Sequence, residues 1–222
     1  MGFVRGLAAI NAVMDGQKKT FDSDSEKVRW LKLNDGDSFK VRFPNELDED
    51  SPAFDENRGL AVVISEHTSP EDFRIKAQCT KDTEGKCWAC EQDEAHPKEG
   101  WRARLRFYTN VLVNDGVEDP YVAVWSQSVS TRSAFNVLRE YAIDMGSVSN
   151  LTWKLKRNGT GTDTSYVLMP LGADAEPFDW SNAKLFNLEK VVREVSYSSQ
   201  EAFYLKLGGE QKQESTSAEI PW

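Results

Sequence analysis

The sequence predicts a mainly β protein with a few helices, an α+β fold class that carries one small metal-binding insertion. Three pairs of runs alternate between apolar and polar residues, and each pair is joined by an Asp-Gly or Asn-Gly turn, which is typical of antiparallel hairpins. One stretch with helical periodicity lies between the second and third pair. All three cysteines gather in one short stretch beside a histidine, in an order that metal ligands use.

Residues 1–20 are expected to form an N-terminal arm. Four apolar residues recur there at helical spacing: Phe3, Leu7, Ile10 and Met14. Three basic residues accompany them: Arg5, Lys18 and Lys19. The pattern predicts a short amphipathic helix. Periodicity alone leaves two interpretations open, because the helix could dock on a neighbouring molecule and mediate self-association, or it could pack on its own domain.

The core is expected to span residues 21–205 and to begin with a hairpin. Residues 28–33 and 38–44 alternate on either side of an Asp-Gly turn. An acidic, proline-containing loop follows at 45–57, and the apolar run 60–65 predicts a strand that leads toward the metal ligands. The clearest strand is 101–113, which turns at 114–116 and pairs with 120–126.

The remaining elements complete a small barrel. A helix is predicted from a cap at Ser130 or Thr131 to Gly146, and the third hairpin pairs 149–157 with 164–170. Apolar residues from 188 to 195 mark a second helix. Three hairpins with one intervening helix are typical of an OB-fold-like five-stranded barrel, here with a small zinc subdomain inserted at about residues 60–100.

The predicted metal ligands are His67, Cys79, Cys87 and Cys90. Zinc is held tetrahedrally by thiolates and imidazole, and a C-x-x-C turn brings two sulfurs to one ion. Three thiolates and one histidine fill the coordination shell, so we expect one structural Zn²⁺ ion rather than a catalytic one. His96 follows the last cysteine closely, and spacing alone leaves it open as the fourth ligand.

Three arginines occupy alternate positions of the strand expected at 101–113. Because neighbouring side chains of a strand point to opposite faces, Arg102, Arg104 and Arg106 share one face with Tyr108. Such a row suits a polyanion, and exposed rings can stack on unpaired bases, at about 1–3 kcal/mol per base. The same mixture of base and aromatic recurs on other expected strands: Trp30, Lys40, Arg42, Phe43, Arg74, Lys76, Trp125, Trp153, Lys154 and Lys156. Rings on strands are also common core residues, and a basic face can simply be solvated.

The bulk composition limits the function classes. The net charge of −9 argues against a nucleic-acid partner as a sum, yet the acid is concentrated in loops while the base lies on expected strands. No apolar run has the length of a membrane span, so no membrane partner is expected. An odd number of cysteines grouped for metal fits a reducing cytoplasm better than a disulfide framework.

Residues 206–222 are expected to be a disordered C-terminal tail, because they are rich in Gly, Ser and Gln and lack periodicity. The last four residues differ from the rest of the tail: Glu219, Ile220, Pro221 and Trp222. An apolar tip with a free carboxylate can be captured by a basic-rimmed pocket on another protein.

The order of His67, Cys79, Cys87 and Cys90 resembles the zinc site of the single-stranded DNA-binding proteins of T-even phages, the gene 32 type. The resemblance implies a zinc subdomain beside an OB-fold, a cleft between them that binds DNA, and His67 as the fourth ligand. It implies a protein without enzymatic activity that coats and protects single-stranded DNA during phage replication, recombination and repair, in the cytoplasm of the infected bacterium. An N-terminal arm in that family mediates cooperative self-association.

The C-terminal tip is similar to the Asp-Ile-Pro-Phe ending of bacterial single-stranded DNA-binding proteins, which implies docking of replication or recombination proteins. Two other function classes remain. One is a zinc-stapled protein–protein adaptor, for which the acidic total would be natural. The other is a zinc-dependent nucleic-acid enzyme of the deaminase kind, although Glu66 precedes His67 instead of following it in an H-x-E arrangement.

Overall fold

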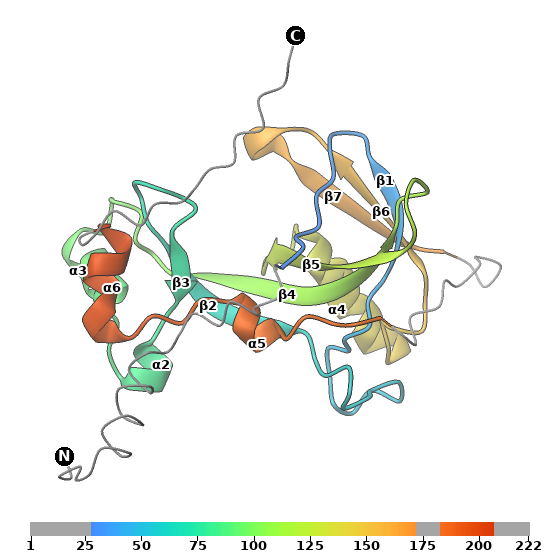
Figure 1. Cartoon of the computed structure of the whole chain (residues 1–222), viewed down its shortest axis with the longest axis horizontal. Helices are drawn as coiled ribbons and strands as arrows, with labels where there is room; N and C mark the ends of the chain where they lie inside the picture. The colour runs from blue at the N-terminus through green and yellow to red at the C-terminus, as the bar shows by residue number, and fades with distance from the viewer. Residues whose placement is uncertain (1–27, 172–182, 207–222) are drawn as a thin grey trace, which may run out of the picture.

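A computed structural model describes residues 28–171 and 183–206 (Figure 1). The expected N-terminal arm at 1–20 and the partner-binding tip at 219–222 therefore lie outside the described residues. Within the described part the chain is mainly antiparallel sheet with a few helices, which confirms the expected class. The strands are β1 (Ser38–Arg42), β2 (Val62–Thr68), β3 (Lys76–Gln78), β4 (Arg104–Asn114), β5 (Tyr121–Ser128), β6 (Trp153–Asn158) and β7 (Ser165–Pro170).

Strand β4 is the element around which the sheet is organised. One edge of β4 is shared, since β2 pairs with its first half, from Val62 opposite Tyr108 to Glu66 opposite Arg104, and β1 pairs with its last residues. The other edge pairs with β5 along most of its length. The strand thus joins two lobes, which stand on the left and right of Figure 1.

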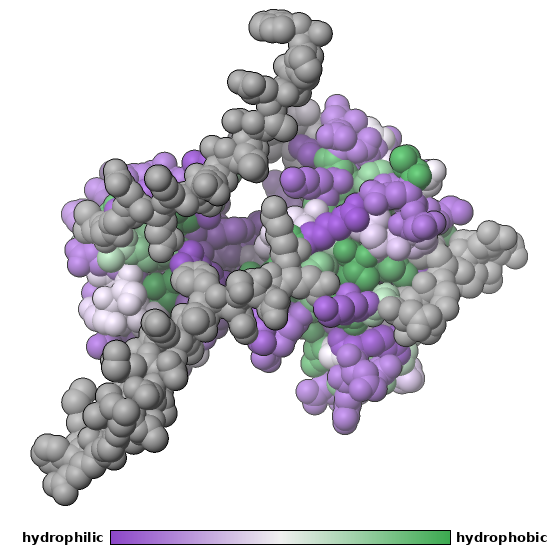
Figure 2. Space-filling model, viewed as in Figure 1, coloured by the Kyte–Doolittle hydropathy of each residue, from purple (hydrophilic) through white to green (hydrophobic). Residues whose placement is uncertain are grey.

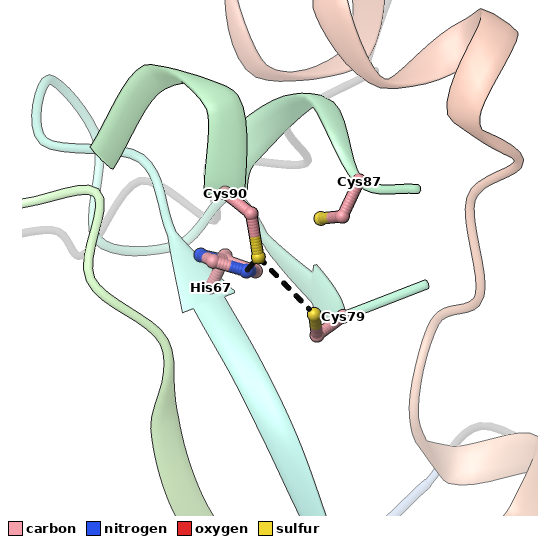
Figure 3. A group of neighbouring side chains, drawn as sticks. All are labelled: His67, Cys79, Cys87 and Cys90. Carbon is pink, nitrogen blue, oxygen red and sulfur yellow. Dashed lines mark hydrogen bonds between the residues drawn. The ribbon is translucent and has the colours of Figure 1, made fainter. Parts of the chain in front are cut away.

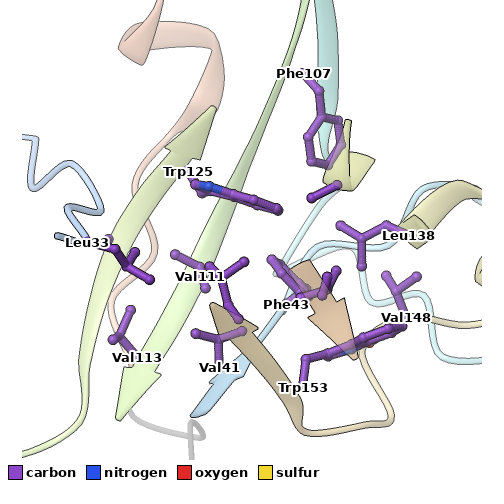
Figure 4. Packing of buried hydrophobic residues seen from close by; sticks show 14 residues of the cluster. Leu33, Val41, Phe43, Phe107, Val111, Val113, Trp125, Leu138, Val148 and Trp153 are labelled. Atoms are coloured by element: carbon purple, nitrogen blue, oxygen red, sulfur yellow. The ribbon is translucent and has the colours of Figure 1, made fainter. Parts of the chain in front are cut away.

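The right-hand lobe is a five-strand unit with the strand order β5-β4-β1-β6-β7. Its strands and α4 (Ala134–Met145) enclose one core, to which Val41, Val111, Trp125, Leu138 and Trp153 contribute (Figure 4). Among the described residues β5 does not pair with β7, so the sheet is open along this seam. The rings of Trp125 and Tyr166 contact each other across it, with centroids 6.2 Å apart.

Helix α4 confirms the predicted helix and its end at Gly146, but the predicted cap at Ser130 or Thr131 is wrong, because the N-cap is Ser133. Ser133, in extended conformation, precedes it, and Gly146 ends it with a φ of 78°, a left-handed angle that glycine adopts without strain. Leu138 is fully buried against the sheet, while Ile143 on the opposite side of the helix and Met145 in its last turn are exposed.

The left-hand lobe, called here the metal lobe, contains the end of β2, β3, α2 (Lys81–Glu84), α3 (Trp88–Ala95) and α6 (Tyr197–Tyr204). Its core is formed by Ala77, Ala89, Trp101, Val195 and Tyr204, with the cysteines packed against them. The rings of Trp88, Trp101 and Tyr204 contact one another with centroids 5.2–6.0 Å apart. The lobe is therefore built from two distant parts of the chain, and α6 was not predicted.

Two predicted elements are wrong. Residues 28–33 do not form a hairpin with β1: Leu31 N donates to Val124 O and Val124 N donates to Arg29 O, so this segment runs along the edge of β5 instead. The predicted helix over 188–195 is a single turn, α5 (Leu188–Val191), followed by extended chain up to α6. The predicted hairpins β4–β5 and β6–β7 are confirmed. The turn of the second hairpin includes the short helix η1 (Gly161–Asp163).

Candidate metal centre and nucleic-acid interface

The predicted metal ligands converge. His67 lies near the end of β2, Cys79 follows β3 directly, and Cys87 and Cys90 begin α3 (Figure 3). One donor atom from each lies within 4.8 Å of all the others, so the group could hold one metal ion. The Sγ atom of Cys90 is 3.5 Å from Cys79 Sγ and 3.3 Å from His67 Nε2.

The imidazole of His67 is oriented for ligation. Its Nδ1 lies 2.6 Å from the carbonyl oxygen of Trp101, and because a carbonyl can only accept, Nδ1 carries the proton. In the neutral imidazole the lone pair of Nε2 is then left for the cluster. A backbone carbonyl behind the second ring nitrogen is the usual way in which proteins fix a ligating histidine.

The thiols oppose one another's ionisation. Burial disfavours the Cys87 thiolate. Hydrogen bonds from a protonated His67 and from the backbone N–H groups of Thr80 and Cys90 together outweigh burial and lower the pKa of Cys87 to about 6. Burial raises the pKa of Cys90 and that of Cys79, and neighbouring cysteines contribute to both shifts. A divalent cation would remove this opposition, since it favours all three thiolates at once.

Gln200 of α6 forms hydrogen bonds with the C-x-x-C turn of the cluster. Its Oε1 accepts from Trp88 N at 2.8 Å and lies 3.4 Å from Cys87 Sγ, while its Nε2 donates to Thr80 Oγ1 and to Val195 O. The side chain is fully buried. Sequence reasoning missed this residue because a single glutamine, 113 positions beyond Cys87, carries no local signal.

His96 is not part of the cluster. Its side chain is half exposed, and Nδ1 lies 3.7 Å from the Glu99 carboxylate. The geometry therefore selects His67 from the two alternatives that spacing left open.

The arginine row leads from the metal lobe toward the five-strand unit. Arg102 and Arg104 are exposed, and neither forms an ion pair or hydrogen bond with a described residue. Arg106 is half-buried, and its Nη2 donates to Ser126 Oγ at 3.0 Å. Phe107 and Val111 point to the opposite face, into the core, as alternation predicts.

A polar pocket of about 450 Å³ opens at the seam between β5 and β7. Hydroxyl groups and two guanidinium groups line it, and none of the described lining residues is acidic: Arg106, Ser126, Gln127, Ser128, Ser130, Arg132, Ser133, Ala134, Thr164, Ser165 and Tyr166. Arg106 and Arg132 have no carboxylate partner within the described residues. This site, called here the seam pocket, is an anion-binding environment in a chain of net charge −9.

The N-terminus of α4 also lies at the seam pocket. Ser133 and Ala134 line the pocket, and no side chain caps the first turn of the helix. The free N–H groups and the positive end of the helix dipole both favour an anion there. The sequence analysis did not predict Arg132 or the serines of the pocket as binding residues. The hydroxyl-rich run 126–133, directly before a predicted helix, was a usable signal.

Four of the aromatic residues predicted to stack on bases are core residues instead. Phe43, Tyr108, Trp125 and Trp153 are between 0% and 3% exposed. Their rings fill the space inside the five-strand unit or under α5, so no face is left for a base. Trp30 at 38% and the half-buried Tyr166 keep an accessible surface.

The other predicted basic contacts are spread over several surfaces. Lys76 lies 3.8 Å from the buried Glu66 carboxylate, which also accepts a hydrogen bond from Tyr108 Oη. Arg74 is paired with Asp72 at 2.9 Å. Arg42 donates to the carbonyl of Ser149. Lys40, Lys154 and Lys156 lie on the outer face of β1 and β6, away from the arginine row.

In the space-filling view a hollow separates the two lobes, and its visible floor is hydrophilic (Figure 2).

No family model, no curated protein sequence and no solved structure matches this chain. Within residues 28–171 and 183–206, no helix combines the length and apolar character that crossing a membrane requires.

Proposed function

We propose that the protein binds single-stranded nucleic acid without sequence preference and has no enzymatic activity of its own. The seam pocket carries this proposal: two guanidinium groups without acidic partners among the described residues, a row of hydroxyls and an uncapped helix N-terminus meet beside the ring of Tyr166. Phosphate contacts of this kind give affinity independent of sequence, and an accessible ring stacks on any base.

The strand order supports an OB-fold-like interpretation of the five-strand unit. Its strands in chain order are β1, β4, β5, β6 and β7, with α4 between the third and fourth, and the first strand pairs with both the second and the fourth. OB-folds are partly open barrels that bind oligonucleotides on the second and third strands, between two loops. The seam pocket lies on β4 and β5 and is bounded by the turn between β6 and β7.

Zinc is the metal that we propose for the cluster. Three thiolates with one imidazole are a typical structural zinc set, and a Zn–S bond of about 2.3 Å places tetrahedral sulfurs about 3.8 Å apart, close to the 3.5 Å between Cys79 and Cys90. With four protein ligands no position is left for a reacting water, which favours a structural role over the deaminase-like alternative.

We propose that the protein coats single-stranded DNA during phage replication, recombination and repair, in the reducing cytoplasm of an infected bacterium. This assignment extends the resemblance of the zinc ligands to the phage family. Docking of partner proteins at 219–222 and self-association through the arm at 1–20 stay predictions from the sequence.

Binding of a labelled oligothymidylate, followed by fluorescence anisotropy at several salt concentrations, tests the proposal. We expect tight binding that weakens steeply with salt, and weaker binding of duplex DNA. Arg106→Glu and Arg132→Glu should each lower the affinity about tenfold or more for every base composition alike. Arg139→Glu is the matched control, because Arg139 is exposed on α4 and already paired with Glu140.

Three results would contradict the proposal: no binding of the single strand, a preference for duplex, or a loss confined to one base sequence. Circular dichroism of each variant separates a binding defect from unfolding.

A further inference from the structure

We propose that the outer face of β1, β6 and β7 is a second phosphate-binding surface, onto which a strand longer than the seam pocket continues. The inference rests on the proposed function and adds the path of the bound polymer to it. The surface, called here the lysine face, is defined by Lys40, Lys154 and Lys156.

The register of the strands places the three ammonium groups side by side. Lys40 is directly opposite Lys154 on the neighbouring strand, and Lys156 follows two residues further along β6. All three point outward, because the alternate residues Val41, Trp153 and Leu155 are fully buried. Spacing along a strand and between strands puts neighbouring members about 5–7 Å apart at their backbones.

None of the three lysines has an ion pair within the described part of the chain. Like charges directly opposite each other on a sheet destabilise it. A protein with more acidic than basic residues nevertheless keeps this face free of acid at the paired positions, which are Ser38, Asn114, Val167 and Met169. Such an arrangement is expected where an external polyanion neutralises the charges.

The lysine face is continuous with the seam pocket through β7. Thr164, Ser165 and Tyr166 line the pocket, and the next outward residue of the same strand, Val167, is paired with Lys156. Met169 is in turn paired with Lys154. A strand that leaves the pocket over β7 therefore meets Lys156 first, then Lys154 and then Lys40.

This continuity favours nucleic acid over an acidic peptide as the occupant. The ammonium group of lysine is a point charge that contacts phosphate without demanding one orientation, which suits a flexible polymer of any sequence. Val167 and Met169, 40% and 44% exposed, provide apolar contact for sugars or bases between the charges.

The test compares a short oligothymidylate of about 5 nucleotides with one of about 20, since one OB-like module covers about 4–16 nucleotides. The variant is Lys154→Glu with Lys156→Glu. The control is Lys98→Glu with Lys190→Glu, which makes the same change in net charge at two exposed lysines away from both surfaces. Affinity and its salt dependence are measured for both oligomers on the full chain.

We expect the Lys154/Lys156 variant to bind the short oligomer as the control does, within about twofold. It should bind the long oligomer about tenfold or more weakly than the control, and its salt slope should be smaller by about 0.7 for each phosphate that it no longer neutralises. Equal weakening on both oligomers, or unchanged binding of the long one, would overturn the inference. So would a variant that binds the long oligomer normally but no longer binds a polyglutamate peptide, which would assign the face to an acidic peptide.

Failure of the proposed function gives a different result, because the wild-type chain would then bind neither oligomer.

Discussion

Glu46 shows how much one residue can differ from the segment that contains it. It belongs to the stretch 45–57, which the sequence predicts to be an acidic, proline-containing loop, yet it is 2% exposed. Its carboxylate accepts hydrogen bonds from Ser147 Oγ, Val148 N and Ser149 N. These bonds tie the chain after β1 to the connection between α4 and β6, so the residue locks two distant loops together.

Replacement of Glu46 by Gln should destabilise the protein by about 1–3 kcal/mol at neutral pH, because an amide NH₂ would face an N–H group that the carboxylate now satisfies. Glu49→Gln, at an exposed position of the same loop, is the control. Urea unfolding of the three proteins measures the difference. Equal stability of both variants would contradict the assigned role.

The pH dependence of this effect has a definite sign. Burial would raise the pKa of Glu46, but the hydrogen bonds from Ser149, Ser147 and Val148 outweigh it, so the pKa is lowered from 4.5 in the folded protein. A lowered folded pKa means that the stabilisation is complete above the unfolded pKa near 4.5 and is lost as the pH falls below it. The difference in the free energy of unfolding between wild type and Glu46→Gln should therefore become smaller as the pH falls below about 4.5.

Single residues also mark where sequence reasoning succeeds and where it stops. The metal ligands were predictable because their chemistry is rare and their spacing is local. The positions of Phe43, Trp125 and Trp153 were not, because a ring on a strand gives the same sequence pattern whether it fills a core or faces solvent. Only the register of neighbouring strands, which no local pattern fixes, decides between the two.

At the scale of elements, α6 connects the end of the described chain to the metal-binding cluster. Its eight residues include Gln200, which contacts the C-x-x-C turn, and Tyr204, which packs in the aromatic cluster with Trp88. The amide of Gln200 satisfies Trp88 N at the start of α3 and fixes the geometry of the C-x-x-C turn.

Gln200→Leu should speed metal release, because the buried Trp88 N–H loses its partner and the turn that holds Cys87 loosens. Outer partners of metal ligands typically change affinity about 10–100-fold, and we expect a weakening in this range. Ser198→Ala, at an exposed position of the same helix, is the control. Transfer of metal to a colorimetric chelator gives the rate, and indistinguishable rates would rule out this role for Gln200.

Elements were predictable where a turn or cap signal was strong. Gly146 ends α4, and the Asn-Gly and Asp-Gly turns define two hairpins. The first predicted hairpin failed although its Asp-Gly turn is present with Gly36 at a φ of 83°. The turn fixes a change of direction, but the edge of β5 offered the segment 28–31 a pairing that a local pattern does not reveal.

At the scale of the whole molecule, β4 couples the two lobes, because its first residues pair with the strand that carries His67 and its later residues line the five-strand core. We therefore expect a loss of structure in the metal lobe to change the position of the arginine row as well. At the same junction the buried Glu66 accepts a hydrogen bond from Tyr108 and forms an ion pair with the half-buried Lys76.

Complete removal of metal with a chelator should loosen the metal lobe and weaken nucleic-acid binding, because ligation supplies folding free energy that this polar segment lacks. Limited proteolysis should then cleave first within 68–99, while the five-strand unit resists. His67→Ala should reproduce both effects, and His96→Ala should reproduce neither. Unchanged affinity and protease resistance in the metal-free protein would contradict the coupling.

The late position of α6 has a consequence for how the chain is made. Cys87 leaves the ribosome 113 residues before Gln200 does. At about 5–20 residues per second, the nascent chain carries its three thiols for roughly 6–23 seconds without the helix that later covers them. Binding of the metal ion during translation, or a chaperone that covers the sulfurs, would protect the nascent chain from oxidation in that interval.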